Sequence, residues 1–219
     1  ALGPAYRLFY ERPLHLVRGS GVHLYDDEGM EYLDFYNNVA SLGHCHPVVV
    51  DALCAQARTL STHTRYLGEG VVDYAEQLLA TMPPDIDHVM FTCTGSEAGD
   101  LALRIARSAT GSRGVIVMRN AYHGVTDLTA AISPSLCGVD RLPSWVRVVD
   151  APDTYRTGGP AQSDVSSRLA ADVEAAIDDL RRSGHGFAAM VADSVLCSDG
   201  VFVGDGDLLT PARAQVAAA

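Results

Sequence analysis

The alternation of strand-like and helix-like segments after residue 88 is the feature that most constrains the fold. Val115–Met118 is an unbroken apolar run, typical of a strand covered on both faces. Asp164–Arg182 carries an apolar stripe at helical spacing, and Phe187–Ala192 reads as a strand again. The stripe consists of Val165, Leu169, Val173, Ile177 and Leu180. Alternating strands and helices imply right-handed crossovers, so we predict an α/β fold with a mostly parallel sheet and flanking helices.

The first part of the chain has a different pattern. Short strand-like runs separated by Gly-rich and Asp-rich turns predict a small antiparallel meander. The predicted strands there are Leu14–Val17, Val22–Tyr25 and Tyr32–Phe35. Helices are expected at 47–60 and 71–82, strands at 88–92 and 146–149, and a last helix from Thr210. We divide the chain into a small-domain segment with its connection, 1–60, and a larger domain, 61–219.

Composition limits the classes of partner. The formal net charge of −11 disfavours nucleic acid and anionic membranes. No apolar run reaches membrane-spanning length, and no signal peptide is recognised at the start. Five scattered cysteines without a C-x-x-C spacing are typical of reduced thiols, so we expect a cytoplasmic protein. The run His44-Cys45-His46 reads as a structural turn rather than a metal site, because no second cluster supplies further ligands.

The stretch from Thr94 to Ala98 follows a predicted strand and opens a predicted helix. Such a step points backbone N–H groups, together with the positive end of the helix dipole, at whatever lies in front. Thr94 and Glu97 have the S/T-x-x-E spacing of a capping box. An anion site and an ordinary capped helix both fit this pattern. Within the helix, Leu101, Ile105 and Ala109 share one face, which we expect to be the core face.

Three turns follow predicted strands and converge on one edge of the sheet. They are the Thr94–Ser96 turn, the turn at Tyr122 and the turn at Asp193. Ligands of open α/β sheets lie outside the carboxyl ends of the strands, so we expect the three turns to line one cleft. Each residue also has a plainer reading: a core aromatic for Tyr122, a helix-start residue for His123, and a loop or cap carboxylate for Asp193.

In order and spacing, these motifs resemble the class III (omega) aminotransferases, which are pyridoxal-phosphate enzymes of fold type I. The resemblance is carried by Thr94–Ala98, Tyr122–Gly124, His44–Pro47, Tyr36–Asn38 and Asp153–Arg156. The last of these, together with 34–47 and 62–66, is most similar to the phospho-lyase branch, which acts on phosphorylated amino alcohols or amino acids. The resemblance covers about the first half of such an enzyme, so the larger domain is expected to be incomplete. It also implies a homodimer and a small amine or amino acid substrate.

The resemblance implies a role for several residues. The cofactor-binding positions that it implies are Thr94, Gly95, Ser96, Tyr122, His123 and Asp193, and the substrate positions are Tyr36 and Arg65. Backbone N–H groups would bind the cofactor phosphate, and the Tyr122 ring would stack on the pyridine, worth about 0.5–1.5 kcal/mol beyond burial. Asp193 stands where many relatives have glutamate. Gly99 stands where the family usually has asparagine. Glycine costs about 1 kcal/mol of helix propensity there. It also lacks the side chain with which the asparagine braces the cofactor loop.

The chain contains no lysine, and all 16 basic residues are arginine. Pyridoxal phosphate needs a lysine amine for its internal Schiff base, and a guanidinium cannot replace that amine. We therefore expect no catalytic residue in this chain and at most non-covalent cofactor binding. Three functions stay open: part of an aminotransferase, part of a phospho-lyase, or a non-catalytic binding or assembly module.

Overall fold

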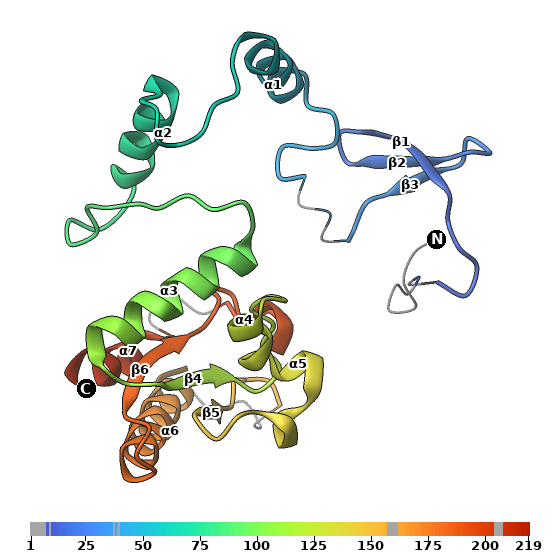
Figure 1. The fold of residues 1–219 in the computed structure, drawn as a ribbon. Coiled ribbons are helices and arrows are strands. Elements are labelled where there is room, and N and C mark those ends of the chain that lie inside the picture. Colours follow the sequence, from blue (N-terminus) through green and yellow to red (C-terminus); the bar gives the residue numbers. More distant parts are fainter. Residues whose placement is uncertain (1–7, 9, 37, 39, 157–161, 204–207) are drawn as a thin grey trace. The chain divides into compact units, whose positions relative to one another are not determined.

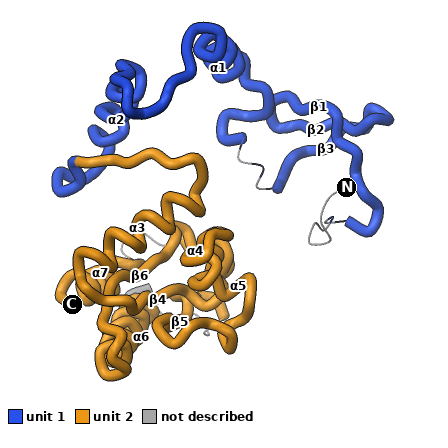
Figure 2. Tube along the Cα trace, in the orientation of Figure 1, with its two compact units in different colours: residues 1–87 blue, residues 88–219 orange. Residues whose placement is uncertain are grey.

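The structure is a computed structural model that describes residues 8, 10–36, 38, 40–156, 162–203 and 208–219. Its contacts divide the chain into two compact units, 1–87 and 88–219, and each is described by itself (Figure 2). The expected domain division after residue 60 stays a prediction. None of the helices in the described residues is long and apolar enough to cross a membrane.

Unit 1 contains the predicted antiparallel meander. Strands β1 (Leu16–Ser20), β2 (His23–Asp26) and β3 (Glu31–Leu33) pair in the order β1-β2-β3 (Figure 1). Helices α1 (Pro47–Thr59) and α2 (Glu69–Leu79) follow, with α2 beginning and ending slightly before its predicted bounds. Among the residues described in unit 1, none is buried: the apolar side of α1 is exposed, and Leu78 and Leu79 on α2 are half-buried.

Unit 2 is built on the predicted parallel sheet. Strand β4 (Gly114–Met118) lies between β5 (Val146–Val149) and β6 (Phe187–Val191), and both pairings are parallel. Every residue of β4 is buried, as its continuous apolar run predicts. Helix α6 (Gln162–Arg182) contacts all three strands, and α7 (Thr210–Ala218) packs on α6. All five residues of the predicted α6 stripe are buried: Val165, Leu169, Val173, Ile177 and Leu180.

Helix α3 (Gly95–Thr110) presents a different face to the core from the predicted one. Leu103 is buried, whereas Ile105 is 52% exposed and Ala109 is exposed. The helix packs on β6 and on α4 (Asp127–Ala131), which selects the Leu103 side. The Arg107 guanidinium lies over the Trp145 ring, 4.2 Å from its centroid. Burial lowers the pKa of Arg107 from its usual value.

One predicted element, the strand before α3, is wrong. The segment 88–92 forms no strand, and its apolar side chains Met90 and Phe91 are exposed. A strand is stabilised by a ladder with a neighbour, and the described sheet β5-β4-β6 provides none to this segment. The turn at residues 120–126 leads into α4, which ends before Pro134, and the short α5 (Pro134–Cys137) follows.

Candidate functional site

The turn that opens α3 has the Thr94 half of the predicted capping box. Thr94 is the N-cap residue, and its Oγ1 accepts a hydrogen bond from Glu97 N at 3.1 Å. Glu97 Oε2 accepts from Cys93 N at 2.9 Å, one residue before the donor of a standard capping box. The N–H groups of Gly95 and Ser96 lie in the first turn, where a helix provides no acceptor of its own. A Cβ at Gly95 would meet no atom within 4 Å, so a ligand can approach this backbone closely.

Ser96 joins this turn to the turn that follows β4. Its Oγ accepts a hydrogen bond from Val125 N at 3.1 Å, and its carbonyl accepts one from Thr126 Oγ1 at 3.3 Å. Gly124 has φ +138, and a Cβ there would lie 2.6 Å from Ser96 Oγ. Only glycine fits this contact. The structure therefore brings together two of the three predicted turns, with Tyr122 beside the contact and 51% exposed.

Gly99 is explained by the same packing. A Cβ at residue 99 would lie 2.9 Å from Thr129 Cγ2 on α4, so a larger side chain would displace that helix. Thr129 is fully buried, and its Oγ1 lies 2.6 Å from Thr126 Oγ1 in a capping box at the start of α4. Close contact between α3 and α4 thus occupies the space that an asparagine side chain at residue 99 would need. Sequence reasoning missed Thr126 and Thr129, although the T-x-x-T spacing was visible.

His123 is held by its backbone while its ring is buried. Its N–H donates to Ser133 Oγ at 2.8 Å. Its Nε2 is buried and has no hydrogen-bond partner among the residues that the structure describes. Burial lowers the pKa of His123, and the carboxylates of Asp193 and Asp199 oppose that shift. The third predicted turn also approaches the turn after β4, because Asp199 in the loop after Asp193 accepts a hydrogen bond from the backbone of Asn120.

Asp193 has the loop-capping role that was left open for it. Its Oδ1 accepts from Val195 N at 3.0 Å and from Cys197 N at 3.1 Å, which fixes the loop after β6. That loop carries Asp199, whose Oδ1 accepts from Asn120 N at 2.9 Å at the end of β4. Burial raises the pKa of Asp199. Sequence reasoning missed Asp199, because a carboxylate before a glycine in a loop gives no sign of a contact with a distant strand.

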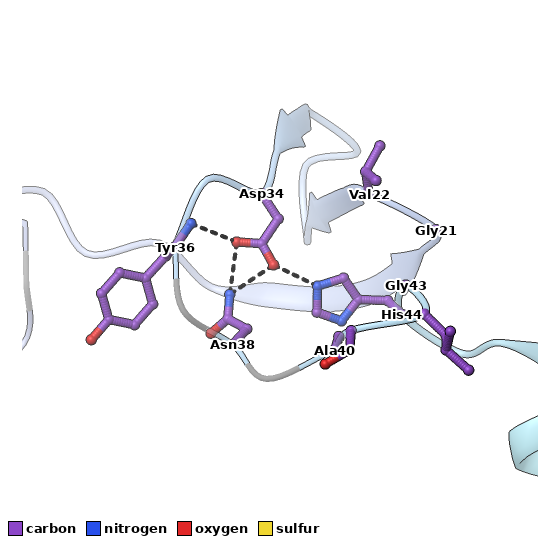
Figure 3. Close-up of a pocket in the computed structure, with 10 residues that line it drawn as sticks. Gly21, Val22, Asp34, Tyr36, Asn38, Ala40, Gly43 and His44 are labelled. Atoms are coloured by element: carbon purple, nitrogen blue, oxygen red, sulfur yellow. Dashed lines mark hydrogen bonds and ion pairs between the residues drawn. The ribbon is translucent and has the colours of Figure 1, made fainter. Parts of the chain in front are cut away.

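The two predicted substrate residues belong to unit 1. Tyr36 is about half exposed and lines a hollow of about 480 Å³ formed by the β1–β2 turn and by residues between β3 and α1 (Figure 3). Arg65 lies in the connection between α1 and α2, where its N–H donates to His63 Nδ1 at 3.2 Å and the residue is exposed. The structure does not bring these two residues into one site.

Known proteins with similar sequences and structures include aminotransferases and a phospholyase. The chain is 39% identical to Alanine--glyoxylate aminotransferase 2-like of Drosophila melanogaster, a match that covers 89% of this chain and 41% of the relative. A phospholyase from Arthrobacter solved with phosphoethanolamine has a TM-score of 0.90 and 40% identity, covering 99% of this chain and 51% of that one. The chain therefore spans about half the length of the proteins that it matches.

An omega transaminase from Pseudomonas jessenii solved with PMP, the amine form of pyridoxal phosphate, has a TM-score of 0.80. It is 25% identical over 97% of this chain and 52% of its own. The profile of the family Aminotransferase class-III matches residues 9–217. Together, the family and the PMP-bound structure indicate pyridoxal phosphate as the cofactor. The chain belongs to the class III aminotransferase family, and it corresponds to the N-terminal half of such an enzyme.

Proposed function

We propose that unit 2 supplies the phosphate-binding and ring-binding part of a pyridoxal-phosphate site. The N–H groups of Gly95 and Ser96 bind the phosphate, and Tyr122 stacks on the pyridine ring. The observation that carries the proposal is the hydrogen bond from Val125 N to Ser96 Oγ, since it joins a helix N-terminus to the turn that bears Tyr122. The open backbone at Gly95 fits a ligand with acceptor groups, as does the buried Nε2 of His123, which has no partner within the described parts of the chain.

The residues of this chain bind and orient the cofactor, and they do not anchor it. When bound, pyridoxal phosphate supplies an electron sink for a substrate amine. Thr94 keeps the start of α3 capped, while Asp193 fixes the loop beside His123. Burial lowers the pKa of His123 and so favours the neutral ring, which has one donor and one acceptor nitrogen. The Schiff-base amine has no candidate here, because the chain has no lysine.

For the complete enzyme, we propose a phosphorylated amino alcohol or amino acid as the substrate. This choice is supported by the Arthrobacter phospholyase solved with phosphoethanolamine, whose sequence is 40% identical to that of this chain. Tyr36 and Arg65 are the proposed substrate contacts, since a guanidinium can bind a phosphate in a bidentate manner. Transamination of an amine or amino acid is the second candidate, favoured by the relationship to the Drosophila protein. A homodimer in the cytoplasm completes the proposal.

Cofactor binding to the 219-residue chain tests the proposal. Equilibrium dialysis should detect pyridoxal phosphate binding, weaker binding of pyridoxal, and loss of affinity in Tyr122→Ala. Pyridoxal is the matched control ligand because it lacks only the phosphate. Equal binding of the two ligands would contradict a phosphate site.

Borohydride reduction separates specific from adventitious attachment. The only primary amine in the sequence is the N-terminal α-amine, so any reduced adduct should map there by mass spectrometry, without dependence on Tyr122. An adduct elsewhere in the chain would overturn the non-covalent assignment. Turnover of phosphoethanolamine against transamination of alanine, measured on a protein completed with a Schiff-base lysine, separates the two candidate reactions.

A further inference from the structure

Asp34 connects several groups at the exit of β3. Its Oδ1 accepts from Tyr36 N at 3.0 Å, and both carboxylate oxygens accept from Asn38 Nδ2 at 2.9 Å (Figure 3). Its Oδ2 lies 2.7 Å from His44 Nε2. The side chains of Asp34 and His44 are only 10% and 19% exposed. This enclosure stands out in unit 1, where none of the described residues is buried as a whole.

His44 is fixed from its other side by the meander. Its N–H donates to Gly21 O at 2.7 Å, and its carbonyl accepts from Gly21 N at 3.0 Å. A Cβ at Gly19 would lie 2.8 Å from His44 Cβ, so the ring rests where a side chain would otherwise be. Gly43 has φ +93, and a Cβ there would lie 2.9 Å from Gly21 Cα. His44 is therefore attached to the β1–β2 turn and can act as a fixed point.

We propose that Asp34 and His44 are a positioning pair that holds Tyr36 in a fixed place relative to the meander. The chain of contacts runs from the β1–β2 turn through the His44 ring to the Asp34 carboxylate and then to the backbone of Tyr36. The inference rests on the proposed function in one respect, namely that Tyr36 meets the substrate. Asp34 and His44 themselves do not touch substrate, and they act through Tyr36.

The same unit contains a matched Asp–His pair that lacks these connections. His15 Nδ1 lies 3.0 Å from Asp27 Oδ2, and the two side chains are 74% and 53% exposed. That pair lies at the opposite end of the meander from the β1–β2 turn, because Asp27 directly follows β2. An exposed pair of this kind contributes little, because solvent screens it. Asp27→Ala therefore removes a comparable Asp–His contact and should leave Tyr36 unaffected.

Amide hydrogen exchange in the 219-residue chain tests the pair. In His44→Ala, the Tyr36 amide should exchange about tenfold faster, since the acceptor on Asp34 is then no longer held in place. His44→Gln should restore slow exchange, because its amide nitrogen can donate near the position of Nε2. Amides of the β1–β2 ladder report whether the meander is still folded, and they should be unchanged in His44→Ala, His44→Gln and Asp27→Ala. Unchanged exchange at Tyr36 in His44→Ala, or equal acceleration in Asp27→Ala, would overturn the inference.

A titration separates this inference from the proposed function. With pyridoxal phosphate present, phosphoethanolamine should shift the Tyr36 amide resonance in the unmodified chain and in His44→Gln, and the shift should be lost in His44→Ala. No shift in the unmodified chain would refute Tyr36 as a substrate contact, which belongs to the proposed function. The exchange measurement would still decide whether Asp34 and His44 hold Tyr36.

Discussion

Val125 N donates a hydrogen bond to Ser96 Oγ at 3.1 Å, across 29 positions of sequence. This bond joins the capped start of α3 to the turn after β4. With the bond from Thr126 Oγ1 to Ser96 O, it makes the two turns one structural element. A substitution in either turn should therefore affect both the fold of unit 2 and the binding of a phosphorylated ring.

Gly124→Ala should destabilise unit 2 by about 1–3 kcal/mol, because residue 124 has a positive φ and its Cβ would collide with Ser96 Oγ. Urea unfolding followed by circular dichroism measures the loss. Gly95→Ala is the control, since a Cβ there meets no atom within 4 Å. Equal stability of the two variants would show that the turns are not in close contact.

Thr94→Ala should cost about 1 kcal/mol of unfolding free energy, since it removes the oxygen that accepts from Glu97 N. Thr94→Ser keeps the hydroxyl and should retain most of the stability. The same urea titration compares the two variants. If serine and alanine proved equally destabilising, the loss would come from the threonine methyl group rather than from the cap.

The Asp199 carboxyl should make stability depend on pH. Its pKa is raised in the folded state by burial, whereas an unfolded aspartate titrates near about 3.9. Between these two values the native state binds more protons than the unfolded state, so stability falls as the pH rises through this window. Asp199→Asn keeps an oxygen for Asn120 N and removes the titration. Unfolding midpoints between pH 4 and pH 7 should decline less in the variant than in the unmodified chain, and parallel profiles would contradict the assignment.

Leu180→Ala should destabilise unit 2 by about 2–5 kcal/mol, because Leu180 on α6 is fully buried. Leu136→Ala is the control, as Leu136 is half exposed and should change stability little. Thermal unfolding monitored by circular dichroism distinguishes the two. Similar melting temperatures would mean that α6 does not cover the sheet through this side chain.

The parallel sheet and α6 were predictable because their patterns depend on burial within the chain itself. Gly114–Met118 is covered on both faces, and the α6 stripe faces the strands. The strand at 88–92 was not predictable, since apolar content does not supply the neighbour that a strand requires. The core face of α3 was wrong for a related reason. Helical spacing defined a stripe through Ile105, but packing on β6 and α4 selected Leu103.

The site was partly predictable. The Thr94 cap follows from local spacing, and the approach of the turns after β4 and β6 follows from the topology of the parallel sheet. Contacts between distant positions were not visible, including those of Asp199 with Asn120 and of Asp34 with His44. Each depends on a loop shape that residue types alone do not determine. The roles of Tyr122, Asp193, Tyr36 and Arg65 toward ligands stay predictions.

The Arg107–Trp145 contact gives the molecule a built-in optical reporter. Trp145 is the only tryptophan in the sequence, and it lies in the core cluster of unit 2 beneath a guanidinium. Its fluorescence emission will therefore change when α3 loosens from that core, and it will not change when the meander of unit 1 unfolds. Fluorescence and circular dichroism curves that separate during denaturation would give the stability of each unit from a single sample.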